Sequence, residues 1–122
     1  MTKKILCVDD SITVRQQLNL TLTKGGFVVI EGCDGVDGLE KLAANPDVKL
    51  IISDVNMPNM GGLDMLEAIR QKPEFATLPV IMLTTEGAPG LIDRAKKAGA
   101  KGWLVKPFTP EQLVQAVNRL AV

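Results

Sequence analysis

Short apolar runs recur along the chain and alternate with longer stretches in which apolar residues have helical spacing. The runs are ILCV at 5–8, FVVI at 27–30, LII at 50–52, VIML at 80–83 and WLV at 103–105. Their apolar residues follow one another without polar alternation, which is typical of strands that are covered on both faces. The pattern predicts five strands that alternate with five helices.

Turn and cap signals separate these elements. The last predicted helix begins at TPEQ, 109–112, with Thr109 as N-cap, Pro110 at the first helical position and Gln112 where a capping box needs it. Stop signals end the four earlier helices at Gly25–Gly26, Asn45–Pro46, Lys72–Pro73 and Gly99. The chain shows no internal repeat and no linker.

Alternating strand–helix units with right-handed crossovers favour one fold class. We expect an α/β, flavodoxin-like, doubly wound (βα)5 domain with a five-stranded parallel sheet in the order 2-1-3-4-5. The 122 residues suit a single domain, 1–122, without an effector domain. All strands then end at one edge of the sheet, where ligands bind in folds of this kind.

Composition narrows the class of protein. Hydrophobic residues make up 46% and charged residues 23%, as in globular proteins, and 14 basic residues balance 14 acidic ones. We therefore expect no binding to nucleic acid or membranes. The apolar run in MTKKILCVDD is too short for a signal peptide, which favours a cytoplasmic protein. Cys7 and Cys33 lack metal-binding spacing, and we expect both to be small core residues.

Polar side chains stand where four of the five strands end. They are Asp9–Asp10 after the first strand, Asp54 after the third, Thr84–Thr85 after the fourth and Lys106–Pro107 after the fifth. The order 2-1-3-4-5 places the first and third strands side by side, so three carboxylates should meet. Their mutual repulsion calls for a counter-ion.

A hard divalent cation suits this set of ligands. Carboxylate and carbonyl oxygens favour Mg²⁺, and the chain has no histidine for a softer metal. Lys106 and Thr84 would add an ammonium and a hydroxyl group to the same crevice. Cation, ammonium and hydroxyl together stabilise the charge of a transferring phosphoryl group, and a spare carboxylate can act as the nucleophile.

Structural roles compete with this interpretation at several residues. Asp9 and Asp10 could cap the following helix, although Ser11 could do so alone. Thr84 could be an ordinary strand-end residue, and Trp103 could simply pack in the core.

Two other classes of protein fit less well. A phosphatase of the haloacid dehalogenase type needs Asp-x-Asp on the first strand and usually a cap domain, whereas this chain has Asp-Asp-Ser. A flavodoxin-like FMN carrier needs a phosphate-cradling loop after that strand, where two aspartates would repel the phosphate.

Four fragments now point to a known family. KILCVDDS, SDVNMPNMGG, MLTTEG and AGAKGWLVKPF stand at strand ends in an order that resembles the receiver domain of two-component response regulators. The resemblance covers the whole length of the chain. Within the family the chain is most similar to the single-domain chemotaxis regulators of the CheY type.

The resemblance implies a role for each residue of the crevice. Asp54 would accept the phosphoryl group and become a 4-aspartylphosphate. Asp10, Asp54 and the main-chain carbonyl of Asn56 would hold Mg²⁺, and Asp9 would support the ion through water. Lys106 and Thr84 would contact the phosphoryl oxygens. Such a protein catalyses only its own phosphorylation and dephosphorylation and is not otherwise an enzyme.

It also implies a switch. In the family the threonine at position 84 is coupled to an aromatic residue on the last strand, which is Trp103 here, whereas tyrosine or phenylalanine is commoner. The Lys106–Pro107 peptide is expected to be cis. Asn56 and Glu86 would tune the rate at which the acyl phosphate hydrolyses.

The implied partners are proteins. A histidine kinase of the CheA type would donate the phosphoryl group. An output protein such as a flagellar motor switch would bind the face made by the fourth helix, fifth strand and fifth helix. A phosphatase would be a further partner. We expect a monomer. The alternative function is a pseudo-receiver, an adapter that binds partners without being phosphorylated.

Overall fold

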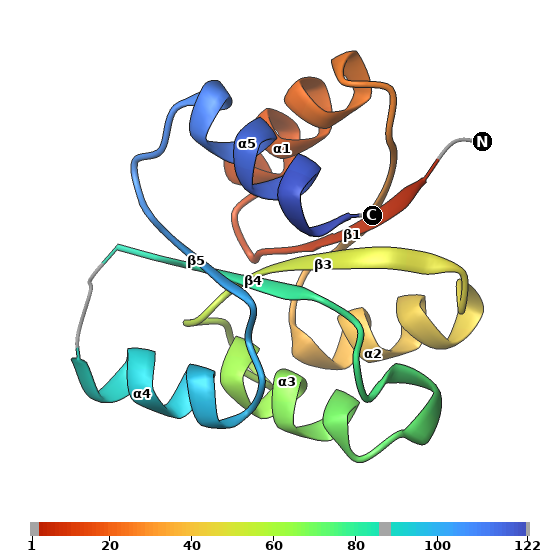
Figure 1. Ribbon diagram of the computed structural model, residues 1–122, viewed down its shortest axis with the longest axis vertical. Helices are drawn as coiled ribbons and strands as arrows, with labels where there is room; N and C mark the ends of the chain where they lie inside the picture. The colour runs from red at the N-terminus through yellow and green to blue at the C-terminus, as the bar shows by residue number, and fades with distance from the viewer. Residues whose placement is uncertain (1–2, 86–88, 122) are drawn as a thin grey trace.

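Five parallel strands form the central sheet of the computed structural model, which describes residues 3–85 and 89–121 (Figure 1). The strands lie in the order β2-β1-β3-β4-β5. Their bounds are β1 (Lys4–Val8), β2 (Val28–Gly32), β3 (Val48–Asp54), β4 (Val80–Thr84) and β5 (Gly102–Val105). The predicted fold class and strand order are confirmed.

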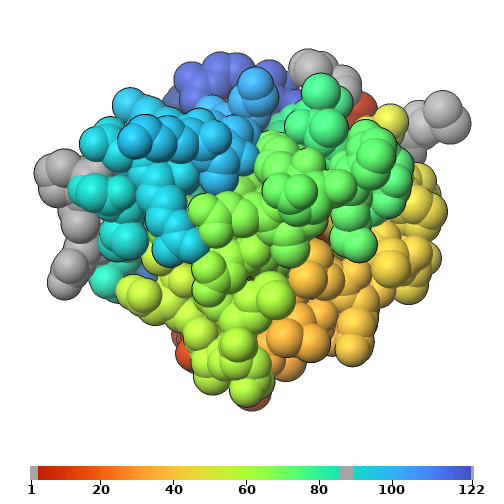
Figure 2. Space-filling view, turned by 90° about the horizontal axis from the view of Figure 1, so that it is seen from below, coloured from red at the N-terminus to blue at the C-terminus, as the bar shows by residue number. Residues whose placement is uncertain are grey.

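Helices cover both faces of the sheet. Their bounds are α1 (Ile12–Lys24), α2 (Gly35–Ala44), α3 (Gly62–Arg70), α4 (Pro89–Lys97) and α5 (Pro110–Leu120). Helices α1 and α5 lie on one face and α2, α3 and α4 on the other (Figure 1). Figure 2 shows the second face, where α3 lies between α2 and α4. In the described part of the chain, none of these helices has the length and apolar character needed to cross a bilayer.

The sheet divides the core in two. Leu6 and Val8 of β1 belong to the cluster under α2, α3 and α4, whereas Ile5 and Cys7 belong to the cluster under α1 and α5. All four side chains are fully buried. Because successive strand residues face opposite sides, a strand covered on both faces needs apolar residues at every position.

Cap residues begin the helices as their chemistry predicts. The Ser11 hydroxyl caps α1 by accepting a hydrogen bond from the Val14 N–H at 3.3 Å. Thr109 and Gln112 form the predicted capping box at the start of α5, with bonds of 3.1 and 2.9 Å. Asp9 and Asp10 are therefore not the cap of α1.

One predicted stop signal lies just beyond its helix, and one predicted environment is wrong. Helix α3 ends at Arg70 with its C-cap at Gln71, directly before Lys72–Pro73, and a short 3₁₀ helix, Pro73–Phe75, follows it. The cause is Pro73, which disfavours a helical conformation at the residue before it, and Lys72 is extended. Cys33 is exposed, not buried, because β2 ends at Gly32 and the Cys33 N–H turns outward to the Asp37 carboxylate at 3.0 Å.

Strand register aligns the ends of the central strands. Val8 of β1 lies opposite Ser53 of β3, and Leu83 of β4 lies opposite Asp54. Thr84 in turn lies opposite Val105 of β5. The residues that follow these positions therefore emerge together at one edge.

Candidate functional site: an acidic crevice at the strand ends

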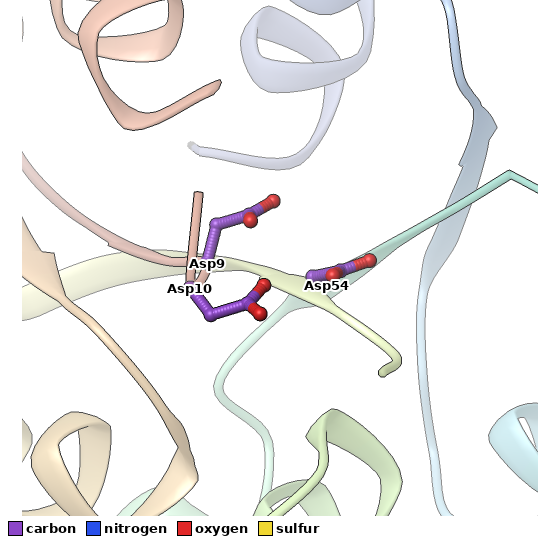
Figure 3. Close-up of side chains that lie close together, drawn as sticks. All are labelled: Asp9, Asp10 and Asp54. Atoms are coloured by element: carbon purple, nitrogen blue, oxygen red, sulfur yellow. The ribbon is translucent and has the colours of Figure 1, made fainter. Parts of the chain in front are cut away.

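Three carboxylates meet at this edge. Asp9 and Asp10 directly follow β1, and Asp54 is the last residue of β3. One carboxylate oxygen from each residue lies within 4.8 Å of the other two (Figure 3). The topology thus gathers the acids that the sequence predicts to converge.

The protein itself occupies both carboxylate oxygens of Asp9, which is fully buried. Oδ1 accepts a hydrogen bond from the Ser11 N–H at 2.9 Å, and Oδ2 accepts one from the Lys106 ammonium at 2.9 Å. The Arg15 guanidinium donates to the Asp9 carbonyl. Asp10, in contrast, is exposed. These bonds fix Asp9 and leave Asp10 as the solvent-exposed acid of the three.

Lys106 is the cation of the crevice. Its ammonium lies 2.9 Å from Asp9 and 3.4 Å from Asp54, and only 16% of its side chain is exposed. Burial by itself lowers the pKa of Lys106, but the hydrogen bond to Asp9 and the charges of Asp9 and Asp54 raise that pKa above its ordinary value. The side chain therefore remains an ammonium ion at neutral pH. The Lys106–Pro107 peptide is cis.

The electrostatic environment of the site disfavours the charged form of Asp54. Burial raises the pKa of Asp54, and the nearby charge of Asp9 raises it further, while Lys106 acts in the opposite direction. The Lys106 ammonium thus lies close to two of the three acids that meet here. Negative charge is therefore in excess in this buried group, and all of its ligand atoms are oxygens. Such a site fits a hard divalent cation such as Mg²⁺.

Thr84 and Trp103 lie on the two strands next to this group. Thr84 is the last residue of β4 and is buried, and its carbonyl accepts the Lys106 N–H at 2.7 Å. Trp103 lies on β5 opposite Met82. It is partly buried and packs against the core cluster under α2, α3 and α4. Its indole nitrogen is buried and has no hydrogen-bond partner among the described residues. Glu86 lies outside the described residues.

Asn56 follows β3 on the loop to α3 and is exposed. Together with Asp10 it lines a cleft of about 510 Å³ that runs past Met57 to Arg94 of α4. A ligand can therefore reach the acids from the side of this loop.

Sequence reasoning missed two groups that hold the crevice. Arg15 links the Asp9 carbonyl to the Glu31 carboxylate, with 3.2 Å between the Arg15 Nε and Glu31 oxygen atoms. The Ser53 hydroxyl, which is fully buried, donates to the Asp54 carbonyl at 2.9 Å. The available signal was a polar residue within a helix or strand at a position that faces the core. Such a residue must have a hydrogen-bond partner, but the sequence does not show which residue that partner is.

Comparison with known proteins agrees with this geometry. The model of the response regulator receiver domain matches residues 5–118. The chemotaxis protein CheY1 of Helicobacter pylori is 46% identical over 116 residues, which is 94% of each chain. The structure of the chemotaxis protein CheY4 of Vibrio cholerae has a TM-score of 0.94 and 42% identity and covers 98% of this chain and 99% of its own.

A further solved structure is a CheX-CheY-BeF3-Mg complex from Borrelia burgdorferi. It has a TM-score of 0.91 and 30% identity and covers 98% of this chain and 90% of that chain. Sequence, fold and crevice geometry lead to one conclusion: the chain belongs to the response regulator receiver domain family, in which it is similar to chemotaxis regulators of the CheY type.

Proposed function

We propose that this chain is a phosphorylation-driven switch in which Asp54 accepts a phosphoryl group from a histidine kinase. The observation that carries the proposal is the meeting of Asp9, Asp10 and Asp54 within 4.8 Å, with the Lys106 ammonium beside them. An Asp54 carboxylate oxygen forms the new bond to phosphorus while the bond from phosphorus to the donor's nitrogen breaks. The product is an aspartyl phosphate.

Each neighbour of Asp54 has a defined task. Lys106, which lies 3.4 Å from Asp54, is placed to pair with phosphoryl oxygens. Asp10, Asp54 and the main-chain carbonyl of Asn56 would hold Mg²⁺, which when bound supplies positive charge to the phosphoryl group. Asp9 holds Lys106 in place through its Oδ2 atom and would support the ion through water.

The switch acts by shifting populations. Thr84 bonds a phosphoryl oxygen, and Trp103 on the adjacent strand responds, which biases an equilibrium between inactive and active forms. The output surface is the face made by α4, β5 and α5, where Val105 is 48% exposed. Asn56 and Glu86 tune how long the phosphoryl group persists.

The partners are those of a phosphorelay. A CheA-like histidine kinase supplies the phosphoryl group, an output protein binds the active form, and a phosphatase is the third partner. The names of the relatives, two of them chemotaxis proteins, support this assignment. Three further expectations stay predictions: that the protein has no effector domain, that it is a monomer, and that it is located in the cytoplasm.

Labelling with a small phosphodonor tests the proposal. With acetyl phosphate and Mg²⁺, wild type should gain one phosphoryl group and Asp54→Asn none. Asp47→Asn is the control, because Asp47 is an exposed acid paired with Lys4 near the start of β3, away from the strand ends. Undiminished labelling of Asp54→Asn would move the acceptor elsewhere, and a folded wild type that takes up no label would favour the pseudo-receiver.

A further inference from the structure

The loop between β3 and α3 contains a strained turn. Of the residues the structure describes, Asn59 is the one non-glycine residue with a positive φ, 65°. The Met60 N–H donates to the Pro58 carbonyl at 2.6 Å and closes a three-residue turn around Asn59. Such a turn with a positive central φ is rare and strained, although asparagine tolerates it better than most residues. The turn therefore depends on contacts outside itself.

Those contacts come from the start of α2. The Asn59 side-chain amide donates to Asp34 Oδ2 at 2.8 Å. The Met60 carbonyl accepts the Gly35 N–H at 2.9 Å. The turn is thus held by one side-chain bond and one backbone bond to two consecutive residues.

Asp34 has a separate task for each of its oxygens. Oδ1 caps α2 by accepting the Asp37 N–H at 2.8 Å, while Oδ2 accepts the Asn59 amide. The residue is only 8% exposed. The hydrogen bonds from the Asp37 N–H and the Asn59 amide lower the pKa of Asp34, so the carboxylate is ionised at neutral pH and accepts both bonds.

The backbones of α2 and the turn are in direct contact. A Cβ atom at Gly35 would lie 2.6 Å from a Met60 side-chain carbon and 2.7 Å from the Met60 carbonyl oxygen. No side chain fits between the two segments. The first residues of α2 therefore form a firm support for the turn.

The other end of the loop is anchored in the sheet. The Val55 N–H donates to the Leu83 carbonyl at 3.0 Å, and the Val55 carbonyl accepts the Gly62 N–H at 2.9 Å. Residues 56–58 span the space between Val55 and the turn. Asn56, which lines the cleft with Asp10, lies in this span.

We propose that Asp34 and Asn59 form a positioning pair for the magnesium site. They hold the strained turn and so keep Asn56 beside Asp10, without touching the phosphoryl group or the cation themselves. The inference rests on the proposed function, because it takes the Asn56 carbonyl to be a ligand of Mg²⁺. A loop released from α2 must be ordered again each time the ion binds, which weakens the apparent affinity.

Two substitutions separate this role from plain structural support. Asn59→Gly keeps access to a positive φ but removes the amide. Asp34→Ser keeps a hydroxyl to cap α2 but removes the oxygen that Asn59 contacts. Thr109→Ala is the control, because it removes a side-chain cap from α5, which lies on the opposite face of the sheet from α2 and α3 (Figure 1).

Backbone NMR spectra recorded during MgCl₂ titration measure the dissociation constant in each variant. We expect a rise of about tenfold for Asn59→Gly and for Asp34→Ser, no further rise in the double variant, and no change for Thr109→Ala. Excess Mg²⁺ should restore the wild-type rate of labelling by acetyl phosphate.

Three results would overturn the inference: dissociation constants equal to that of wild type, a rise as large in Thr109→Ala, or effects that multiply in the double variant. A wild type whose spectrum does not respond to Mg²⁺ would instead refute the magnesium site on which the proposed function depends. The two failures are therefore distinguishable.

Discussion

Two clusters of acids and a cation lie on the same half of the molecule and differ in nearly every physical respect. On the surface between α3 and α4, the Arg94 guanidinium contacts Asp64 at 2.7 Å and Glu67 at 2.8 Å. About half or more of each of these side chains is exposed, from 46% for Arg94 and Glu67 to 63% for Asp64. Water and salt screen such pairs, which add little to stability.

The crevice has a similar charge count but a different environment. Asp9 is fully buried, and Asp54 and Lys106 expose only 12% and 16% of their side chains. Burial strengthens the interaction between the charges and also leaves the excess negative charge without hydration. The raised pKa of Asp54 is the sign of that cost.

The comparison shows which feature marks a functional site. Close ion pairs occur in both clusters, so short distances alone do not distinguish them. The crevice differs because its charges are buried, so its excess negative charge lacks the hydration that the surface cluster keeps.

The largest effect should follow from removing the crevice cation. Lys106→Met leaves Asp9 and Asp54 buried without their ammonium, and we expect a loss of about 3 kcal/mol in the free energy of unfolding. Urea titration in metal-free buffer at pH 7 measures it. Lys101→Met, at an exposed lysine, is the control and should change little. A loss no greater than that of the control would place the crevice charges in the same class as the surface pairs.

The next largest effect should come from replacing glycine by alanine, a change that we compare beside the crevice and in α4. A Cβ atom at Gly62, which begins α3 beside the crevice, would lie 2.0 Å from the Asp54 carbonyl oxygen, so Gly62→Ala should cost about 2–3 kcal/mol. Gly90 of α4 has open space around it, and Gly90→Ala should stabilise the helix by about 0.5–1 kcal/mol. Thermal unfolding of both variants tests the pair, and changes of the same sign would contradict it.

Neutralising the acceptor should stabilise the metal-free protein. A carboxylate whose folded pKa is raised favours folding while it is protonated, and that contribution is lost as the pH rises through the folded pKa. Asp54→Asn should therefore raise the melting temperature by a few degrees at pH 7, and the gain should vanish below about pH 4, where the acid is protonated in both states. A lower melting temperature at pH 7 would mean that the Lys106 contact outweighs burial.

The smallest effect should come from the surface cluster. Arg94→Met removes both contacts to α3 but leaves solvated acids, so we expect the melting temperature to fall by less than about 2 °C at low salt. In roughly 1 M NaCl the difference should disappear. A large change that persists in salt would show that Arg94 holds α4 in a way that ion pairing does not explain.

Particular residues show how far the sequence could be interpreted. Asp9, Asp10, Asp54 and Lys106 were predicted to meet because each follows a buried strand, and parallel strands of known order end at one edge. The stop signal at Lys72–Pro73 lies directly after the C-cap of α3, because a proline tells where a helix cannot continue rather than at which residue it ends.

Other features had no local signal. Asp34 and Asn59 are 25 residues apart, and nothing in either motif names the other as its partner. The same holds for Arg15 and Glu31, which pair across the end of β2. Cys33, just after an apolar run and without metal-binding spacing, was expected in the core, but β2 ends at Gly32 and Cys33 is exposed.

The amino-acid sequence alone determined the alternation of strands and helices and the chemical groups at the strand ends, because backbone periodicity and turn chemistry act between neighbours in the chain. The folded chain was needed to show that both Asp9 oxygens are engaged within the protein, that Asp10 is open to solvent, and that α2 supports the turn at Asn59. The physical reason is that the energy of a charge or hydrogen bond depends on distance and burial, which arise when segments remote in the chain pack together.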